Sequence, residues 1–183
     1  MPIIQASHPV FAPILTGHSK KNDARYGNGV RCGNLLTVST AENFIQLPRF
    51  SGGKSVFTQA SVVLNTSSLP FCAYEKMFDC ILQDNKIIDP PEVGVWGGFG
   101  YIEGAINMKG DYEVWVTWIK RVIFTPPPMS AVSRVNGSVT LTTPSVAGTA
   151  YLDGSKGWRE RDCFKSPAEA IRYLKYKAGI VCE

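Results

Sequence analysis

The segment "DYEVWVTWIKRVIF" (111–124) restricts the fold of this chain more than any other stretch. Its apolar residues alternate with other residues, and this two-residue period is typical of a β-strand with one buried face. The face expected to be buried consists of Tyr112, Val114, Val116, Trp118, Val122 and Phe124. The opposite face carries Glu113, Trp115, Thr117 and Arg121. Three prolines (126–128) end the strand, because proline has no amide hydrogen for a strand ladder.

Further short segments favour the same class of structure. Strands are expected over 32–40 and 55–65, and Asn136-Gly137 indicates a hairpin turn within 133–143. In the second of these strands one face is expected to hold Val56, Thr58, Ala60, Val62 and Leu64. With 183 residues and only 19% charged residues, the sequence predicts one all-β domain with a substantial core.

Two segments have a helical period instead. Within 68–83 the apolar residues recur at helical spacing, as Phe71, Tyr74, Phe78, Ile81 and Leu82. The C-terminal segment 167–178 is the clearest amphipathic helix, with Ser166 as N-cap and Glu169 completing a capping box. Gly179 is the expected stop signal. We therefore expect one short inserted helix and one C-terminal helix.

Residues 1–30 are expected to form an extended N-terminal arm, because prolines and glycines interrupt any regular period there. Residues 31–183 then form a single domain that includes the C-terminal helix. The net charge is +4, and residues 1–31 hold four basic residues against one acidic residue. Those basic residues are Lys20, Lys21, Arg25 and Arg31. Such an end could contact polyanions or acidic partners, or it could be a solvated tail.

The glycine-rich stretch "VWGGFGYIEG" (95–104) could be a phosphate-binding loop or a bent strand. A dinucleotide fingerprint needs three glycines at fixed spacing between a strand and a helix, but here the chain after Gly104 leads into another strand. The Walker sequence is also absent around Gly53-Lys54-Ser55. Glycines in a strand more often mark bulges, bends or close backbone approach, and we expect that here.

No motif for catalysis or metal binding stands out, and we expect neither an enzyme, a cofactor nor a metal. Both histidines, His8 and His18, lie in the expected arm. The five cysteines have no close pair and are expected to be free thiols. The acidic residues Asp79, Asp84, Asp89 and Glu92 match no calcium loop, and Asp111 resembles a turn residue.

Two alternatives stay open. A β-barrel module that binds single-stranded nucleic acid would use aromatic residues beside basic ones, with Trp158 and Tyr173 as candidates. A small enzyme would need a pocket that holds two or more of four acidic residues, which are Asp79, Asp84, Asp89 and Asp111. Assembly subunits such as phage tail-type proteins form a third class, because they too are rich in β-strands and lack a recognisable active site.

The order of expected elements resembles the coat proteins of small icosahedral picorna-like RNA viruses. It comprises the arm (1–30), strands near 35–40 and 56–64, a helix near 71–82, and paired strands to residue 152. It is most similar to the small coat protein of plant viruses with three coat proteins, the cheraviruses of the family Secoviridae. The resemblance covers the organisation of most of the chain and includes no signature motif. The end of the chain in Glu183 is compatible with processing from a polyprotein.

The resemblance implies an antiparallel β-sandwich of the viral jelly-roll type and a purely structural function. The subunit would assemble with copies of itself and related coat proteins into an icosahedral shell that encloses RNA. Lys20, Lys21, Arg25 and Arg31 would face the interior and contact the genomic RNA weakly and without sequence preference. The chain begins without the pattern of a signal peptide, so the expected location is the virion, or the host cytoplasm during assembly, with no membrane partner.

Overall fold

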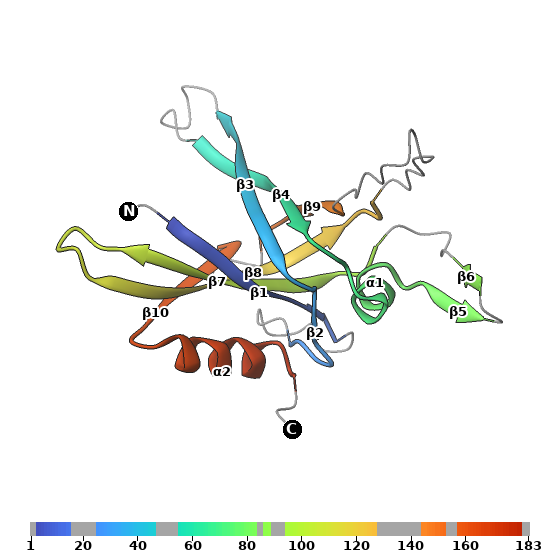
Figure 1. The fold of residues 1–183 in the computed structure, drawn as a ribbon. Coiled ribbons are helices and arrows are strands. Elements are labelled where there is room, and N and C mark those ends of the chain that lie inside the picture. The colour runs from blue at the N-terminus through green and yellow to red at the C-terminus, as the bar shows by residue number, and fades with distance from the viewer. Residues whose placement is uncertain are drawn as a thin grey trace, which may run out of the picture.

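A computed structural model describes residues 3–15, 25–46, 55–83, 86–88, 94–127, 144–152 and 157–180. These residues form mainly strands, with two helices between them (Figure 1). The strands are β1 (Ile3–Pro13), β2 (Val30–Arg31), β3 (Leu35–Gln46), β4 (Ser55–Thr66), β5 (Ile81–Gln83), β6 (Lys86–Ile88), β7 (Gly97–Ile106), β8 (Tyr112–Phe124), β9 (Ser145–Ala150) and β10 (Arg159–Phe164). The helices are α1 (Phe71–Phe78) and α2 (Pro167–Lys177).

Eight of these strands form one connected sheet in the order β2-β1-β7-β8-β9-β4-β3, with β10 also paired to β8. The paired strands run antiparallel throughout. The sheet branches at β8, because β10 pairs with residues 114–119 and β9 with residues 122–124. The prediction of an all-β, antiparallel fold with two helices is confirmed. The finer prediction, a jelly roll, stays a prediction.

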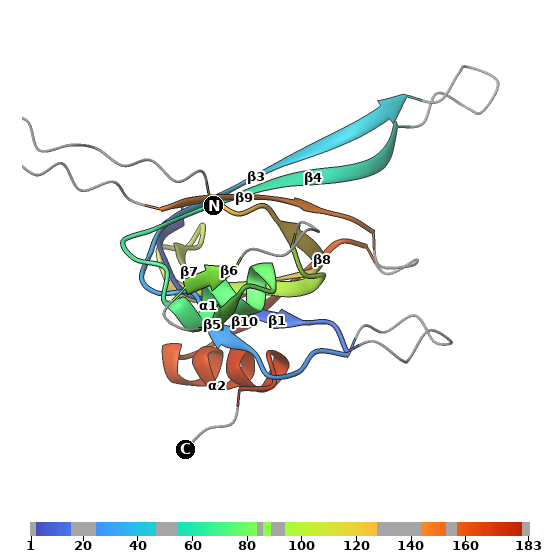
Figure 2. The same ribbon diagram turned by 90° about the vertical axis from the view of Figure 1, so that its right-hand side faces the viewer.

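The curled sheet has a hydrophobic core on each of its two faces. Inside the curl, Phe11, Phe99 and Phe124 pack with α1 and with β4. On the outer face, α2 covers Val10, Ile102 and Trp118. Figure 2 shows α2 on the opposite side of the molecule from the far end of β3 and β4. The central strands are therefore shielded from solvent on both faces.

The apolar stripe of β8 is confirmed as buried from Val114 to Phe124, but Tyr112, expected in the same stripe, is 58% exposed. The stripe also does not stay on one face. Val114, Val116 and Trp118 lie in the outer core, whereas Val122 and Phe124 lie in the inner one. The switch coincides with a bulge: β7 advances two residues from Gly97 to Phe99 while β8 spans Ile119 to Val122. One extra residue in a strand reverses which face its later side chains point to.

The expected N-terminal arm is wrong for residues 3–13. These residues form β1, which pairs with β7 and lies inside the sheet. The prolines that suggested an irregular arm sit where a strand tolerates them. Pro9 lies in a register shift between Ser7 and Val10, next to His8 with φ of 53°, and Pro13 is the last residue of β1.

The helix predictions differ in outcome. The C-terminal helix is confirmed, with the Ser166 hydroxyl accepting a hydrogen bond from the Glu169 amide at 3.3 Å. The extension of the first helix to Leu82 is wrong. The helix ends at Phe78, Asp79 adopts a left-handed backbone with φ of 56°, and β5 begins at Ile81. A left-handed residue is a common helix terminus, and periodicity alone did not reveal it.

The two early strands are confirmed with shifted bounds, since β3 runs on to Gln46 and β4 ends at Thr66. The hairpin turn at Asn136-Gly137 lies outside the described residues. The glycine-rich stretch forms β7, a buried strand and not a phosphate loop. A Cβ atom at Gly98 or Gly100 would lie 2.3 or 2.4 Å from the ring of Trp118. These two glycines thus allow an indole to pack against the strand backbone.

Candidate assembly surface

The outer part of β3 and β4 forms a hairpin that projects beyond the body of the protein (Figure 2). Its strands pair from Leu35 with Thr66 to Gln46 with Ser55. Large apolar side chains near the far end are open to solvent, with exposed fractions of 53% for Phe44 and 59% for Ile45. Val56, the partner of Ile45 across the hairpin, is exposed as well. We call this region (residues 42–46 and 55–59) the projecting hairpin.

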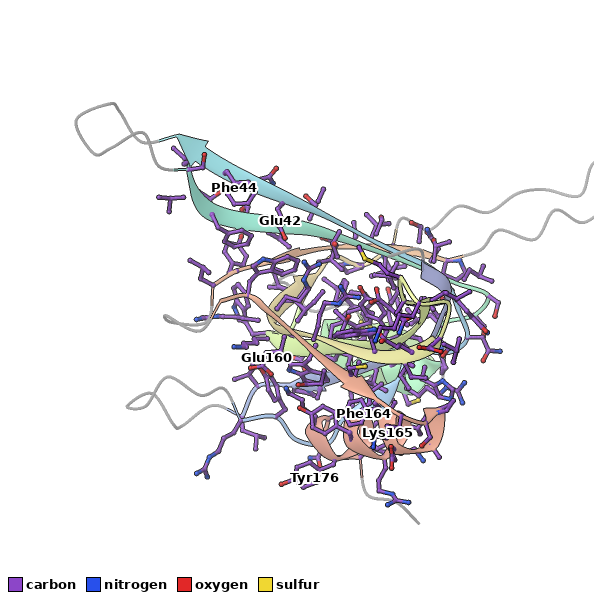
Figure 3. All side chains as sticks on the ribbon, turned by 90° about the vertical axis from the view of Figure 1, so that its left-hand side faces the viewer. Glu42, Phe44, Glu160, Phe164, Lys165 and Tyr176 are labelled. Atoms are coloured by element: carbon purple, nitrogen blue, oxygen red, sulfur yellow. The ribbon has the colours of Figure 1, made fainter. Side chains whose placement is uncertain are left out.

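Aromatic stacking attaches the projecting hairpin to the body. The ring of Phe57 stacks on Trp158 at 5.6 Å between centroids, and it meets Phe44 edge-on at 6.0 Å. A salt bridge of 3.5 Å joins the carboxylate of Glu42 to Arg159, the residue after Trp158. Figure 3 shows Glu42 and Phe44 on this hairpin, at the opposite end of the view from Tyr176 on α2. Phe57 is the cross-strand partner of Phe44, so the attachment to the body reaches that level of the hairpin. Of the described residues, the exposed Ile45 and Val56 lie beyond it.

Three described strands of the sheet pair with a single neighbour, namely β10 on its branch and the two strands at the ends of the main path. β3 ends the path on one side and pairs with β4 alone, while the two-residue β2 ends it on the other side. An unpaired strand edge presents backbone amides and carbonyls that can pair with another chain. β3 has 12 residues, and its side chains carry a single charge, that of Glu42. It therefore lacks the dense charge that usually blocks edge pairing.

The basic residues predicted to face RNA are only partly described. Arg25 and Arg31 are both exposed, and Arg31 donates a hydrogen bond to the Asn34 side chain at 3.4 Å. Lys20 and Lys21 lie outside the described residues. Arg25 precedes the bridge between Ile14 and Tyr26, whereas Arg31 belongs to β2. The structure places the two arginines on separate segments.

The acidic candidates are not brought together where the structure describes them. Asp79 is the exposed residue after α1, and Asp111 lies in the turn between β7 and β8. The Asn107 side chain accepts hydrogen bonds from the Lys109 and Asp111 amides at 2.9 Å. Asp84 and Asp89 lie outside the described residues. Among the described residues, no three His, Cys, Asp or Glu side chains are placed to hold a metal ion.

The aromatic candidates for base stacking are already engaged within the protein. Trp158 is 8% exposed and stacks on Phe57, while the Arg159 guanidinium lies 4.7 Å from the centroid of its indole. The Tyr173 hydroxyl donates a hydrogen bond to Asp162 at 2.9 Å. The Tyr173 ring also lies 5.0 Å from the Phe164 ring between centroids, so both aromatic candidates have ring partners within the protein, where stacked bases would need an open face. Cys32, Cys72, Cys80 and Cys163 are free thiols, as expected.

A network of charges that the sequence pattern did not reveal joins β10 to β8 and to α2. The Glu160 carboxylate pairs with Lys120 at 2.9 Å and also with Lys177 of α2. Burial raises the pKa of Glu160, but hydrogen bonds from both lysines outweigh it and lower the pKa below its usual value. On the same strand, Arg161 pairs with the buried Glu103 at 2.5 Å. In the sequence, the one indication of this network was Glu103, a glutamate within the apolar, glycine-rich stretch 95–104.

Comparison with known proteins leaves the family open. No protein-family model matches the chain, and no curated protein does. A solved structure titled "Crystal structure of Hcp protein" is similar at 8% sequence identity, with a TM-score of 0.31. The match covers 86% of this chain and 100% of that one. This likeness is too low to bear on fold or function. Neither described helix is long and apolar enough to cross a membrane.

Proposed function

We propose that this chain is a structural subunit that joins copies of itself into a ring-based tube of the phage-tail type. The observation that carries the proposal is the projecting hairpin with its solvent-exposed Phe44 and Ile45. Exposed apolar groups on an ordered, protruding element favour burial against another chain. A second copy supplies a partner of fixed shape at high local concentration, which suits an assembly protein.

The two ends of the sheet support this geometry. β3 lies at one end of the strand order and β2 at the other. Contact between two different surfaces of identical chains is heterologous, and it closes into a ring or continues as a filament. The projecting hairpin and α2 also lie on opposite sides of the molecule. A contact made by the hairpin would therefore join different surfaces of two copies, so that all copies point the same way. Rings that stack through such contacts form a tube.

A shell of coat subunits around RNA is the second candidate. The exposed guanidinium groups of Arg25 and Arg31 favour it, because they could neutralise phosphates on an inner surface. Its partners would be copies of the chain, related coat proteins and genomic RNA. The buried Trp158 and the hydrogen-bonded Tyr173 offer no such support to a monomeric module that binds single-stranded nucleic acid.

Electron microscopy of the purified full chain, with absorbance at 260 and 280 nm, tests the proposal and separates the two candidates. We expect rings or tubes with the absorbance ratio of protein alone. Closed shells that carry nucleic acid would replace the tube with the coat-protein candidate. A monodisperse monomer over the whole accessible concentration range would overturn both.

A further inference from the structure

A pocket of about 390 Å³ lies between α2 and the strands β1 and β2, on the side of the molecule away from the projecting hairpin. Its walls are mainly aliphatic and come from Val10, Val30, Ile171, Leu174 and Ile180. The volume lies in the range of about 300–1,000 Å³ that small-molecule sites occupy. The pocket thus offers an apolar chamber of ligand size.

The polar groups at this pocket carry a single sign of charge. Arg31 from β2 and Lys175 from α2 line it together with His8 and Gly29, and no acidic side chain of the described residues does. The salt bridges found within the described part of the chain include neither Arg31 nor Lys175. Two cations beside an apolar wall, without an internal carboxylate, favour a ligand that carries the missing negative charge.

His8 is held at the pocket by an unusual backbone. Its φ of 53° lies in the left-handed region, at the bulge where the register of β1 on β7 shifts. Residues other than glycine rarely adopt this conformation, and such strain gathers at functional sites. Its Nδ1 lies 3.0 Å from the Ser7 hydroxyl, within hydrogen-bonding distance. Burial, then the charges of Arg31 and Lys175, lower the pKa of His8, so the ring is neutral at pH 7.

A neighbouring pocket lies on the other side of His8. A second pocket of about 180 Å³ has His8 and Ile171 in its wall as well, and it extends along Ile102, Val114 and Pro167. Cations line the first pocket, whereas the wall of the second combines these aliphatic side chains with the polar residues Gln5, Ser7 and Tyr112. A ligand with one charged end and a short flexible chain matches this distribution.

We propose that this pocket binds a small amphipathic carboxylate, with its carboxylate between Arg31 and Lys175 and its aliphatic chain along Val10, Leu174 and Ile171. The two cations provide charge-assisted hydrogen bonds, which are shorter and stronger than neutral ones. The aliphatic chain gains from leaving water for the walls of the pocket. The site lies away from the projecting hairpin, while its residues Val30 and Arg31 belong to β2, one of the two strand edges that the proposed function uses for assembly.

Equilibrium dialysis of the full chain with radiolabelled octanoate tests the site. We expect saturable binding of one octanoate per chain, and at least about tenfold weaker binding of octan-1-ol, which has the chain without the charge. Lys175→Met should weaken octanoate binding by about tenfold. Arg172→Met is the matched control, since Arg172 is an exposed cation on the same helix outside the pocket lining, and it should leave binding unchanged.

A photoreactive octanoate with a diazirine at the end of its chain locates the bound ligand. We expect the covalent label on peptides that contain Val10 or residues 171–174. Labelling elsewhere, equal affinity for octan-1-ol, or equal effects of the Lys175 and Arg172 variants would overturn the proposal. These outcomes do not bear on whether the chain forms rings or tubes.

Discussion

The pair β7–β8 and the pair β3–β4 are both long antiparallel hairpins, yet they have opposite relations to solvent. In β8 the side chains from Val114 to Phe124 are mostly buried, since α2 covers one face and the inner core the other. In β4 the burial declines along the strand, from Leu64 in the core to the exposed Val56. The alternation of residues is alike in both pairs, so what differs is the presence of a covering layer.

That difference indicates which region is complete within one chain. In the buried pair, the apolar side chains pack against other parts of the same chain, and the Trp118 ring packs on the glycines of β7. Among the described residues of the outer pair, Phe44, Ile45 and Val56 stay exposed, and the proposed function assigns their cover to a second chain. Four sets of substitutions probe this contrast, in order of their effect on stability.

Trp118→Ala should have the largest effect on the buried pair. The indole is 1% exposed and packs in the outer core against Tyr26 and Leu174. Truncating a buried aromatic side chain costs about 3–5 kcal/mol. Chemical denaturation should show this loss in the free energy of unfolding. Trp96→Ala is the control, because Trp96 is partly exposed, and a loss of equal size there would refute the contrast.

Gly100→Val should destabilise the same region from the strand side. A Cβ at Gly100 would lie 2.4 Å from the Trp118 ring and 2.6 Å from a methyl carbon of Leu174. Inserting side-chain volume into a packed core costs about 1–3 kcal/mol. Thermal unfolding measures the change. If the variant is as stable as the parent protein, the glycines of β7 are not needed for close packing.

Glu160→Gln tests the charges that hold α2 and β10 on β8, with a dependence on pH. Because the pKa of Glu160 is lowered in the folded state, its pairing contributes stability above its usual pKa of 4.5. This contribution, about 1 kcal/mol for a partly exposed group, is lost as the pH falls through the folded pKa. The gap in unfolding free energy between parent and variant should be constant near pH 7 and close below pH 4.5. A gap that persists in acid would mean that the carboxylate charge is not its source.

Phe44→Ser with Ile45→Ser should have the smallest effect on folding. Both side chains are more than half exposed, and substitutions at such sites change stability by about 0.5 kcal/mol. Chemical denaturation of the dilute monomer measures this. A loss as large as that of Trp118→Ala would place these residues in the folding core and remove the basis for an external partner.

The sequence predicted what depends on local periodicity and missed what depends on a single residue or a distant partner. The stripe of β8 and the capped helix α2 follow directly from spacing, and both were found. The change of face after Ile119 was not predictable, because a bulge is set by the register with β7. Nor was the strand at residues 3–13, since the bulge at Pro9 hides its period.

The candidate sites show the same limit. Exposure of Phe44 and Ile45 could not be read from an apolar run that looks like any buried strand. The pocket under α2 unites His8, Arg31 and Lys175, which are far apart in the sequence. Of the residues predicted from charge, Arg25 and Arg31 are exposed as expected, but their contact with RNA stays a prediction.

Sedimentation velocity of the parent chain beside two surface variants decides whether the projecting hairpin joins subunits. We expect the parent to sediment as a large assembly, the Phe44→Ser, Ile45→Ser variant as a folded monomer, and Tyr176→Ser like the parent. Tyr176 is an exposed aromatic residue on α2, on the other side of the molecule, which makes it the matched control. If the parent stays monomeric, or if the hairpin variant assembles as fully as the parent, the projecting hairpin is not an assembly surface.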